Sequence, residues 1–350
     1  MFHVDYPPYM PNLNFIAGIL TVLAVNYYVN LRKIPDSYKW GFTIFCFILL
    51  LIFPIPFFKE NRLFGSIPTG LSDYRSYPPF TLVSYIIILF KYYSIQFNAI
   101  KAPQNAPGLK FVMTFIFLLP NYVMNYGPEG IKAKEPEKAK KENRILMFKY
   151  LVQFVISYLF IVLFFVFVPI PWNAIASCFK GFSSIPIITG AGLIVIAMFI
   201  IGSSTFSFVS AFYNTLGGYD FKFYQNKAFI ATSVGDFWKR WNLWGNEWFN
   251  IYMYKPLRRK YKFSHIQAML SIFLFSGLIH AYVISMINPY FAWLTFFIFF
   301  INGLVLAIEK PVIEKFPFIT KLPKPVKFLL TFIYLDITLG LFGLCFTKWP

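Results

Sequence analysis

The chain has 350 residues, of which 58% are hydrophobic, 22% aromatic and only 13% charged. Soluble domains carry roughly 25% charged residues, so this composition excludes an ordinary soluble protein and indicates an integral membrane protein. The net charge of +18 does not call for a nucleic-acid partner, because Lys and Arg accumulate in the cytoplasmic loops of membrane proteins.

Membrane-spanning helices need about 20 apolar residues, and the chain contains a series of such runs. They lie at about 13–30, 40–58, 80–98, 109–125, 145–170, 186–214, 265–287, 290–308 and 327–347. We therefore predict an all-α polytopic integral membrane protein with about 8–10 transmembrane helices. Since no linker separates the runs, residues 1–350 are predicted to form a single membrane-embedded domain, with a motif-bearing core at about 200–310.

Three basic stretches between the predicted spans indicate the topology. They are 126–149, 216–264 and 309–327, and an even number of spans separates each from the next. All three are therefore expected on one side, which the excess of Lys and Arg makes cytoplasmic. The short basic stretch at 32–39 then falls on the other side, unless an early segment is re-entrant. We expect a multi-pass protein of the endoplasmic reticulum if the source is eukaryotic, or of the plasma membrane if it is bacterial.

The ends and the cysteines offer few further signals. No Lys or Arg precedes the first apolar run, so no cleavable signal peptide is expected. The cysteines Cys46, Cys178 and Cys345 make neither a metal-ligand spacing nor an even set for disulfides. With only three histidines in the chain, we expect no metal site.

The predicted span 186–214 carries a polar seam in its second half. Its members are Ser203, Ser204, Thr205, Ser207, Ser210 and Asn214. Such a seam is typical of close helix packing, with hydroxyl groups that bond back to the backbone. The alternative is a wall of a solvated or substrate-bearing cavity.

His280 lies about fifteen residues into the predicted span 265–287. An ionisable side chain at membrane depth is by default a candidate functional residue. Ser276 and Gly277 lie on the same helix face and leave room beside the imidazole. Apolar surroundings disfavour the charged form, so a neutral imidazole is available to accept a proton as a general base. The alternative is a structural histidine that bonds a neighbouring helix.

Residues 236–260, DFWKRWNLWGNEWFNIYMYKPLRRK, combine tryptophan, amide and basic side chains in an otherwise apolar chain. If 237–250 is one helix, its four tryptophans fall within an arc of roughly 120°. They are Trp238, Trp241, Trp244 and Trp248. The stretch is too charged to span, so we predict a re-entrant or interfacial segment. An amphipathic interface anchor accounts for the tryptophans and the terminal cations, but not for Asn242.

Two linked motifs extend this interpretation. The first is ATSVGDFWKRWN, at 231–242, and the second is SGLIH, at 276–280, whose histidine follows Asn242 by 38 residues. An apolar helix that ends at Glu309 comes next. Together they resemble the membrane-bound O-acyltransferase (MBOAT) superfamily, and more narrowly its wax-synthase-type branch. The resemblance covers roughly residues 219–310.

The resemblance implies roles for both motifs. His280 would be the base that deprotonates an alcohol, so that its oxygen attacks an acyl-CoA thioester. Asn242 would orient the substrate or bond the developing oxyanion. Acyl-CoA is a co-substrate, and no cofactor is expected. Further candidate substrate-binding residues are Trp238, Trp241, Ser276, Lys239, Arg240, Arg258 and Arg259. Lys260 is a further candidate cation next to Arg259. These cations are candidates for CoA phosphate contacts, or else reflect topology or anionic lipid binding.

Departures from the branch leave the acceptor open. The wax-synthase-type box usually reads FWGRRWN, one residue longer than FWKRWN here, and the shorter form is closer to sterol and diacylglycerol acyltransferases. Those enzymes usually have a His-Lys-Trp where this chain has Asn246-Glu247-Trp248, and a Glu in place of Ala281. A long-chain alcohol, giving a wax ester, is the first choice of acceptor, and a sterol or diacylglycerol is next. A short-chain (acetyl) O-acyltransferase and a non-catalytic transporter or scaffold are the alternatives.

Overall fold

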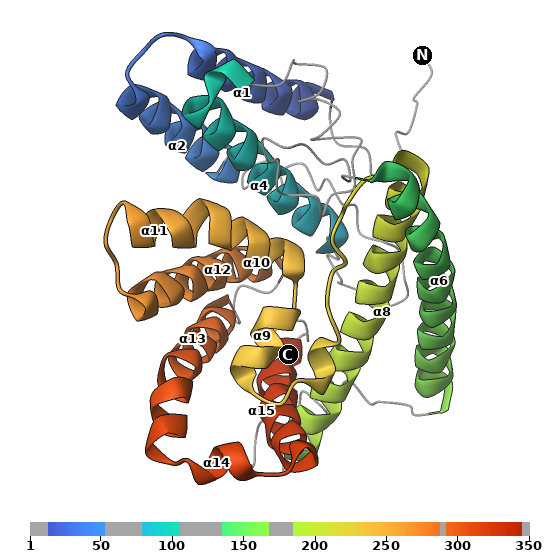
Figure 1. Ribbon diagram of the computed structural model, residues 1–350. Helices are drawn as coiled ribbons and strands as arrows, with labels where there is room; N and C mark the ends of the chain where they lie inside the picture. The colour runs from blue at the N-terminus through green and yellow to red at the C-terminus, as the bar shows by residue number, and fades with distance from the viewer. Residues whose placement is uncertain (1–12, 53–78, 106–134, 168–184, 288–291, 345–350) are drawn as a thin grey trace, which may run out of the picture. The chain divides into compact units, whose positions relative to one another are not determined.

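The computed structural model describes residues 13–52, 79–105, 135–167, 185–287 and 292–344 (Figure 1). These residues are mostly α-helical and contain no β-sheet, which confirms the predicted all-α membrane fold. The chain divides into two compact units, Met1–Gly130 and Ile131–Pro350. The organisation of residues 1–350 as a single functional domain stays a prediction.

Each predicted span that falls within the described residues is a helix. These helices are α1 (Leu13–Leu31), α2 (Asp36–Ile52), α4 (Pro79–Lys101), α6 (Pro136–Phe167), α8 (Ile185–Gly217), α12 (His265–Ile287), α13 (Ala292–Lys315) and α15 (Lys324–Leu344). By length and composition, His265–Ser285, Ala292–Lys315 and Lys324–Phe342 are able to cross a membrane. The predicted span 109–125 lies outside the described residues, and the total number of spans stays a prediction.

The bounds of α6 differ from the prediction because its charged first turns are helical as well. The helix begins at Pro136, earlier than the predicted 145, and proline suits the first turn of a helix. Glu137 then pairs with Lys140 at 2.7 Å, one turn later. The span prediction follows only the apolar part, so it misses this polar extension.

The first unit packs α1, α2 and α4 around polar side chains. Asn30 donates to Thr43 Oγ1 at 3.0 Å and to Gln96 Oε1 at 2.7 Å, and Asn26 donates to the hydroxyl of Tyr92. All five side chains are at most 1% exposed. Since an apolar interior offers no water, these side chains bond one another and tie the three helices together, although Oδ1 of Asn30 has no partner among the described residues.

In the second unit α8 packs against α6 and α15, and α12 packs against α13 (Figure 1). The end of α8 returns to the start of α6, where Asn214 Nδ2 donates to Asn143 Oδ1 at 3.3 Å. The described part of the first basic stretch and the start of the second therefore lie at the same end of this hairpin, as the topology requires. The cytoplasmic location of that end stays a prediction.

A non-helical segment, 218–227, runs back along α8 after the helix ends. The side chain of Asn214 accepts from the N–H of Phe221 at 2.9 Å and donates to its carbonyl at 3.0 Å. Gln225 Nε2 donates to Ser203 Oγ at 2.6 Å, further back on the same helix. Side chains of α8 bond the backbone of Phe221 and Lys222, and backbone groups of α9 and α10 bond that of Asn226 and Tyr224, so the segment packs within the protein without becoming helical.

The polar side chains of the α8 seam therefore form hydrogen bonds within the fold. Ser203 and Ser204 each donate to the carbonyl of Ile200 at 2.8 Å, which is the back-bonding expected for a packed helix. Ser210 and Asn214 bond the segment 218–227 instead. The segment leads to the 3₁₀ turn η5 (Ala228–Ile230) and so delivers the 231–242 motif to the middle of the unit.

The periodicity of the tryptophans suggests one helix over 237–250, but the structure does not contain one. Two short helices, α9 (Val234–Arg240) and α10 (Leu243–Phe249), are separated by two residues, and η6 (Asn250–Tyr254, a π-helix) and α11 (Lys255–Arg259) follow. Asn242, at the break, has a left-handed backbone with φ 41° and ψ 62°. A right-handed helix ends at such a residue, and asparagine adopts this conformation more readily than most side chains.

The break also changes where the tryptophans point. Trp241, Trp244 and Trp248 are at most 8% exposed. Trp241 packs against Phe199 of α8 with ring centroids 4.8 Å apart. The tryptophans thus belong to the interior of the unit, and the expectation of a surface anchor is wrong for them.

Candidate active site

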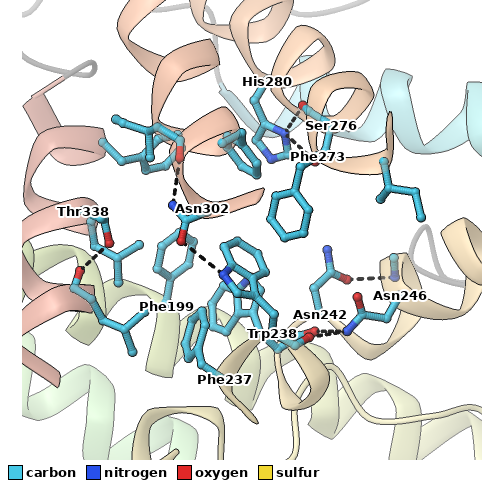
Figure 2. A pocket seen from close by; sticks show the side chains of 18 of the residues that line it. Phe199, Phe237, Trp238, Asn242, Asn246, Phe273, Ser276, His280, Asn302 and Thr338 are labelled. Atoms are coloured by element: carbon cyan, nitrogen blue, oxygen red, sulfur yellow. Dashed lines mark hydrogen bonds between the residues drawn. The ribbon is translucent and has the colours of Figure 1, made fainter. Parts of the chain in front are cut away.

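A cavity of about 180 Å³ lies in the second unit, where α9 and α10 meet α8, α12, α13 and α15. Figure 2 shows it from close by. Aromatic and aliphatic side chains line most of it, including those of Phe199, Phe237, Phe273 and Phe299. Its polar lining is the set Tyr224, Asn242, Asn246, Ser276, His280, Asn302 and Thr338. Such an apolar cavity with a few polar groups is typical of a site for a lipophilic ligand.

Asn242 presents its amide to this cavity from the break between α9 and α10 (Figure 2). Its Oδ1 accepts from the N–H of Gly245 at 3.0 Å and so caps α10. Among the described residues, Nδ2 has no hydrogen-bond partner. The cap fixes the side chain by its oxygen and leaves its N–H groups to donate to a molecule in the cavity.

Asn246 of α10 joins the start of α10 to the end of α9 by hydrogen bonds. Its Nδ2 donates to the carbonyl of Trp238 at 2.6 Å and to that of Trp241 at 2.8 Å. These carbonyls belong to the end of α9 and lack a helical partner, because the helix does not continue. One turn of α10 thereby fastens the end of α9 and fixes the position of Asn242 between them.

His280 reaches the cavity from α12, and its ring is oriented by its own helix (Figure 2). Nδ1 lies 2.7 Å from the backbone oxygen of Ser276 and 3.4 Å from the hydroxyl of the same residue. A carbonyl oxygen can only accept, so Nδ1 must carry the proton of the neutral imidazole. Nε2 is then the unprotonated nitrogen, as a general base requires.

An aromatic ring fixes the imidazole from the side. Phe299 of α13 stacks on His280 with ring centroids 4.1 Å apart and an angle of 28° between the planes. Gly277 makes this approach possible, because a Cβ there would lie 3.1 Å from Cβ of Phe299. Gly303 has the reciprocal role on α13, since its Cβ would lie 2.8 Å from Cβ of Phe273. The glycine of the SGLIH motif thus serves the packing that orients its histidine.

Asn302 links three helices at the cavity wall. Its Oδ1 accepts from Trp238 Nε1 at 3.2 Å and from the hydroxyl of Tyr334 at 3.0 Å. Its Nδ2 donates to the carbonyl of Ile298 at 2.8 Å. Both ends of this amide are committed within the protein, so Asn302 supports Trp238 of α9 from α13 and α15.

The polar residues of the 231–242 motif hold α9 together. Ser233 is the N-cap, and its Oγ accepts from the N–H of Asp236 at 3.0 Å. Asp236 in turn accepts from the N–H of Thr232, the residue before the N-cap, at 3.3 Å, so the two side chains together satisfy two backbone N–H groups at the start of the helix. Its other oxygen accepts from Arg240 Nε at 2.7 Å. The spacing Ser-x-x-Asp-x-x-x-Arg is therefore explained by the hydrogen bonds of the helix itself.

Tyr224 completes the aromatic surroundings of the break. Its ring lies 5.3 Å from that of Trp241 and 5.0 Å from that of Trp244. Its carbonyl accepts from the N–H of Leu243 at 2.8 Å. Burial raises the pKa of the Tyr224 phenol, so its hydroxyl stays protonated at any working pH.

The structure brings part of the predicted site together. His280, Asn242, Trp238, Trp241 and Ser276 all line the cavity. The predicted cations do not. Lys239 is exposed, and Arg240 pairs with Asp236. Arg258 and Arg259 are exposed on α11, and the structure does not place them beside the five that line the cavity.

Four polar residues of the cavity lining were not predicted from the sequence, namely Tyr224, Asn246, Asn302 and Thr338. Asn302 stands alone in the apolar run FFINGLVLA, and a polar residue in a predicted span is a signal that points to it. Asn246 gives no such signal, because its role depends on a helix break that periodicity does not show.

The sequence of this region is similar to that of known proteins. Residues 222–301 match the sequence profile of the family described as "Membrane bound O-acyl transferase family", and this range includes both Asn242 and His280. A probable long-chain-alcohol O-fatty-acyltransferase 8 of Arabidopsis thaliana is 29% identical over 143 residues. That alignment covers 38% of this chain and 42% of the relative, so the chain matches less than half of the relative's length.

Proposed function

Because the chain belongs to the membrane-bound O-acyltransferase superfamily, we propose that it transfers a fatty acyl group to the hydroxyl of a lipophilic alcohol. A long-chain alcohol is the acceptor that we favour, since the relative from Arabidopsis thaliana is named for that activity. The apolar cavity supports a substrate with a hydrocarbon body. A sterol or diacylglycerol acceptor and a short acyl donor remain alternative outcomes of the tests below.

His280 is the general base in the proposed mechanism. Its Nε2 takes the proton from the alcohol as the alcohol oxygen attacks the thioester carbon. The tetrahedral intermediate then collapses, the carbon–sulfur bond breaks, and the ester forms. The imidazolium returns its proton to the departing thiolate of CoA, so His280 ends the cycle neutral.

Asn242 stabilises charge on the carbonyl oxygen in this mechanism. During attack the thioester oxygen becomes an oxyanion, and Nδ2 of Asn242 donates a hydrogen bond to it. Because Oδ1 is held by Gly245, the donor is oriented before the substrate arrives. Removal of one preorganised donor of this kind typically lowers the rate by about 10²- to 10³-fold.

Acyl-CoA is the proposed donor, and its phosphates remain in the aqueous phase. The exposed cations of α11 and the turn after it, Lys255, Arg258, Arg259, Lys260 and Lys262, are candidates to bind them. Arg258 also donates to the carbonyl of Phe263 at 2.6 Å and so shapes the turn. Anionic lipid headgroups also carry phosphates and are alternative ligands for these cations. We propose that the protein is a multi-pass acyltransferase of the membrane.

One observation carries the proposal. His280 and Asn242 line the same apolar cavity, and within the described part of the chain neither Nε2 of His280 nor Nδ2 of Asn242 has a hydrogen-bond partner. The bonds that hold the opposite atom of each side chain are local to α12 and α10. Both groups are therefore preorganised for proton transfer and oxyanion binding without a ligand.

The test is the release of CoA thiol by the purified full-length chain. With palmitoyl-CoA and hexadecanol, the wild type releases thiol at a rate that depends on the alcohol. His280→Ala abolishes this release, whereas His265→Ala, a matched change at an exposed histidine that contacts Tyr254, does not. Full activity in His280→Ala contradicts the mechanism.

The acceptor is identified in a host that lacks neutral lipids. Expression of the chain and thin-layer analysis of total lipids reveal a new ester, which is a wax ester under our proposal. A sterol ester or triacylglycerol assigns a different acceptor, and acceptance of acetyl-CoA over palmitoyl-CoA by the purified protein assigns a short-acyl transferase.

A further inference from the structure

Helix α9 carries Trp238 and leads directly to Asn242, yet it has only seven residues. A helix of this length is not stable alone, and the backbone N–H groups of its first turn have no helical partner. Its direction must therefore be set by contacts from other elements. The contacts that act on its start decide where its far end, and with it Asn242, is placed.

Glu309, near the end of α13, holds the start of α9. Its Oε1 accepts from the N–H of Val234 at 2.9 Å, and its Oε2 accepts from the N–H of Gly235 at 3.0 Å. A carboxylate on the two leading N–H groups of a helix is a charge-assisted contact that the helix dipole favours. A Cβ at Gly235 would lie 2.5 Å from Oε2, so the end of the Glu309 side chain would have to move away from the N–H groups to make room for it.

A second contact from the same helix fixes the middle of α9. Asn302 precedes Glu309 by seven residues, which is about two helical turns, so both face the same side of α13. Asn302 accepts from the indole N–H of Trp238. Two points on one rigid helix thus define the direction of α9.

A small change in the direction of α9 is enough to displace Asn242. Seven residues span about 10 Å, and a tilt of about 6° moves the far end by about 1 Å. A displacement of about 1 Å at a reacting group lowers a rate by up to about 100-fold. A loose start of α9 is therefore sufficient to misplace the amide of Asn242.

We propose that Glu309 is a positioning residue for acyl transfer, which acts by clamping the start of α9 and thereby fixing Asn242 in the cavity. This role rests on the proposed function, in which Asn242 bonds the oxyanion. Glu309 itself is not among the residues that line the cavity, so it would act through α9.

The test is a double-mutant cycle between Glu309 and Gly235 in the full-length chain. Glu309→Ala removes the clamp, and Gly235→Ala pushes the carboxylate off the N–H groups. Each change alone is expected to lower kcat by roughly 10- to 100-fold with little change in KM for the alcohol. The double variant is expected to be no worse than either single one, since both remove the same contact. Glu314→Ala, on the same helix and exposed, is the matched control.

Hydrogen exchange provides a readout that does not depend on activity. The amides of Val234 and Gly235 are expected to exchange faster in Glu309→Ala and at the wild-type rate in Glu314→Ala. If the wild type makes no ester, the proposed function fails while the exchange result still tests the clamp. Wild-type kcat in Glu309→Ala, additive losses in the cycle, or unchanged exchange at the two amides overturns the positioning role.

Discussion

The amide of Asn246 provides a prediction that separates hydrogen bonding from bulk. Asn246→Asp keeps the size of the side chain but replaces the amide group that donates to the carbonyls of Trp238 and Trp241. A carboxylate has no N–H and repels both carbonyl oxygens. We therefore expect Asn246→Asp to be at least as damaging as Asn246→Ala, although it is the more conservative change in shape.

The expected magnitudes differ for stability and rate. Each neutral hydrogen bond contributes about 0.5–1.5 kcal/mol, and the side chain is exposed, so water replaces part of the loss. We expect a decrease of about 1 kcal/mol in the free energy of unfolding, against a total of about 5–15 kcal/mol for a typical protein. The protein stays folded, while Asn242 loses its fixed place and kcat falls by about tenfold or more.

The assay is alcohol-dependent thiol release, measured beside thermal unfolding in the same detergent. Asn250→Asp makes the same chemical change at an exposed position in the next element and controls for added negative charge. The reasoning is refuted if Asn246→Asp keeps the wild-type kcat, or if it is clearly more active than Asn246→Ala. Either result means that the break between α9 and α10 does not depend on this amide.

Three further predictions concern other parts of the site. Ser276→Ala is expected to keep at least about half of the wild-type kcat, because the backbone oxygen and not the hydroxyl makes the short bond to His280; a loss above tenfold contradicts this. Gly277→Ala is expected to lower the unfolding free energy by about 1 kcal/mol or more and to reduce kcat, since its Cβ would approach the facing helix to 3.1 Å; unchanged melting and turnover count against the packing argument. Joint replacement of Arg258 and Arg259 by alanine is expected to raise KM for acyl-CoA without lowering kcat, with a smaller effect in high salt; an unchanged KM at low salt removes them from the donor site.

The sequence was sufficient where one residue stood out against its surroundings. His280 is an ionisable group within an apolar run, and Asn242 is a residue that an interface helix does not explain. Both line the cavity. The helical spans were equally accessible, because apolar runs of this length have few other folded forms in a membrane.

The rest depended on tertiary contacts that no local pattern encodes. The periodicity of 237–250 favoured one helix, but Asn242 adopts a left-handed conformation that Asn246 stabilises from the next turn. Arg240 carried the same charge that a phosphate contact would need, yet it pairs with Asp236. Charge alone does not distinguish a residue that binds a ligand from one that holds a helix.

The distribution of the cavity along the chain has a consequence for biosynthesis. Its walls come from α8 through α15, so residues as far apart in sequence as Phe199 and Phe342 must meet before it exists. A growing chain that has inserted α12 already contains both Asn242 and His280, but it still lacks α13, whose Phe299 stacks on His280 and whose Glu309 bonds the start of α9. Under the proposed function, acyl transfer is thus expected to begin only after the later helices have been inserted.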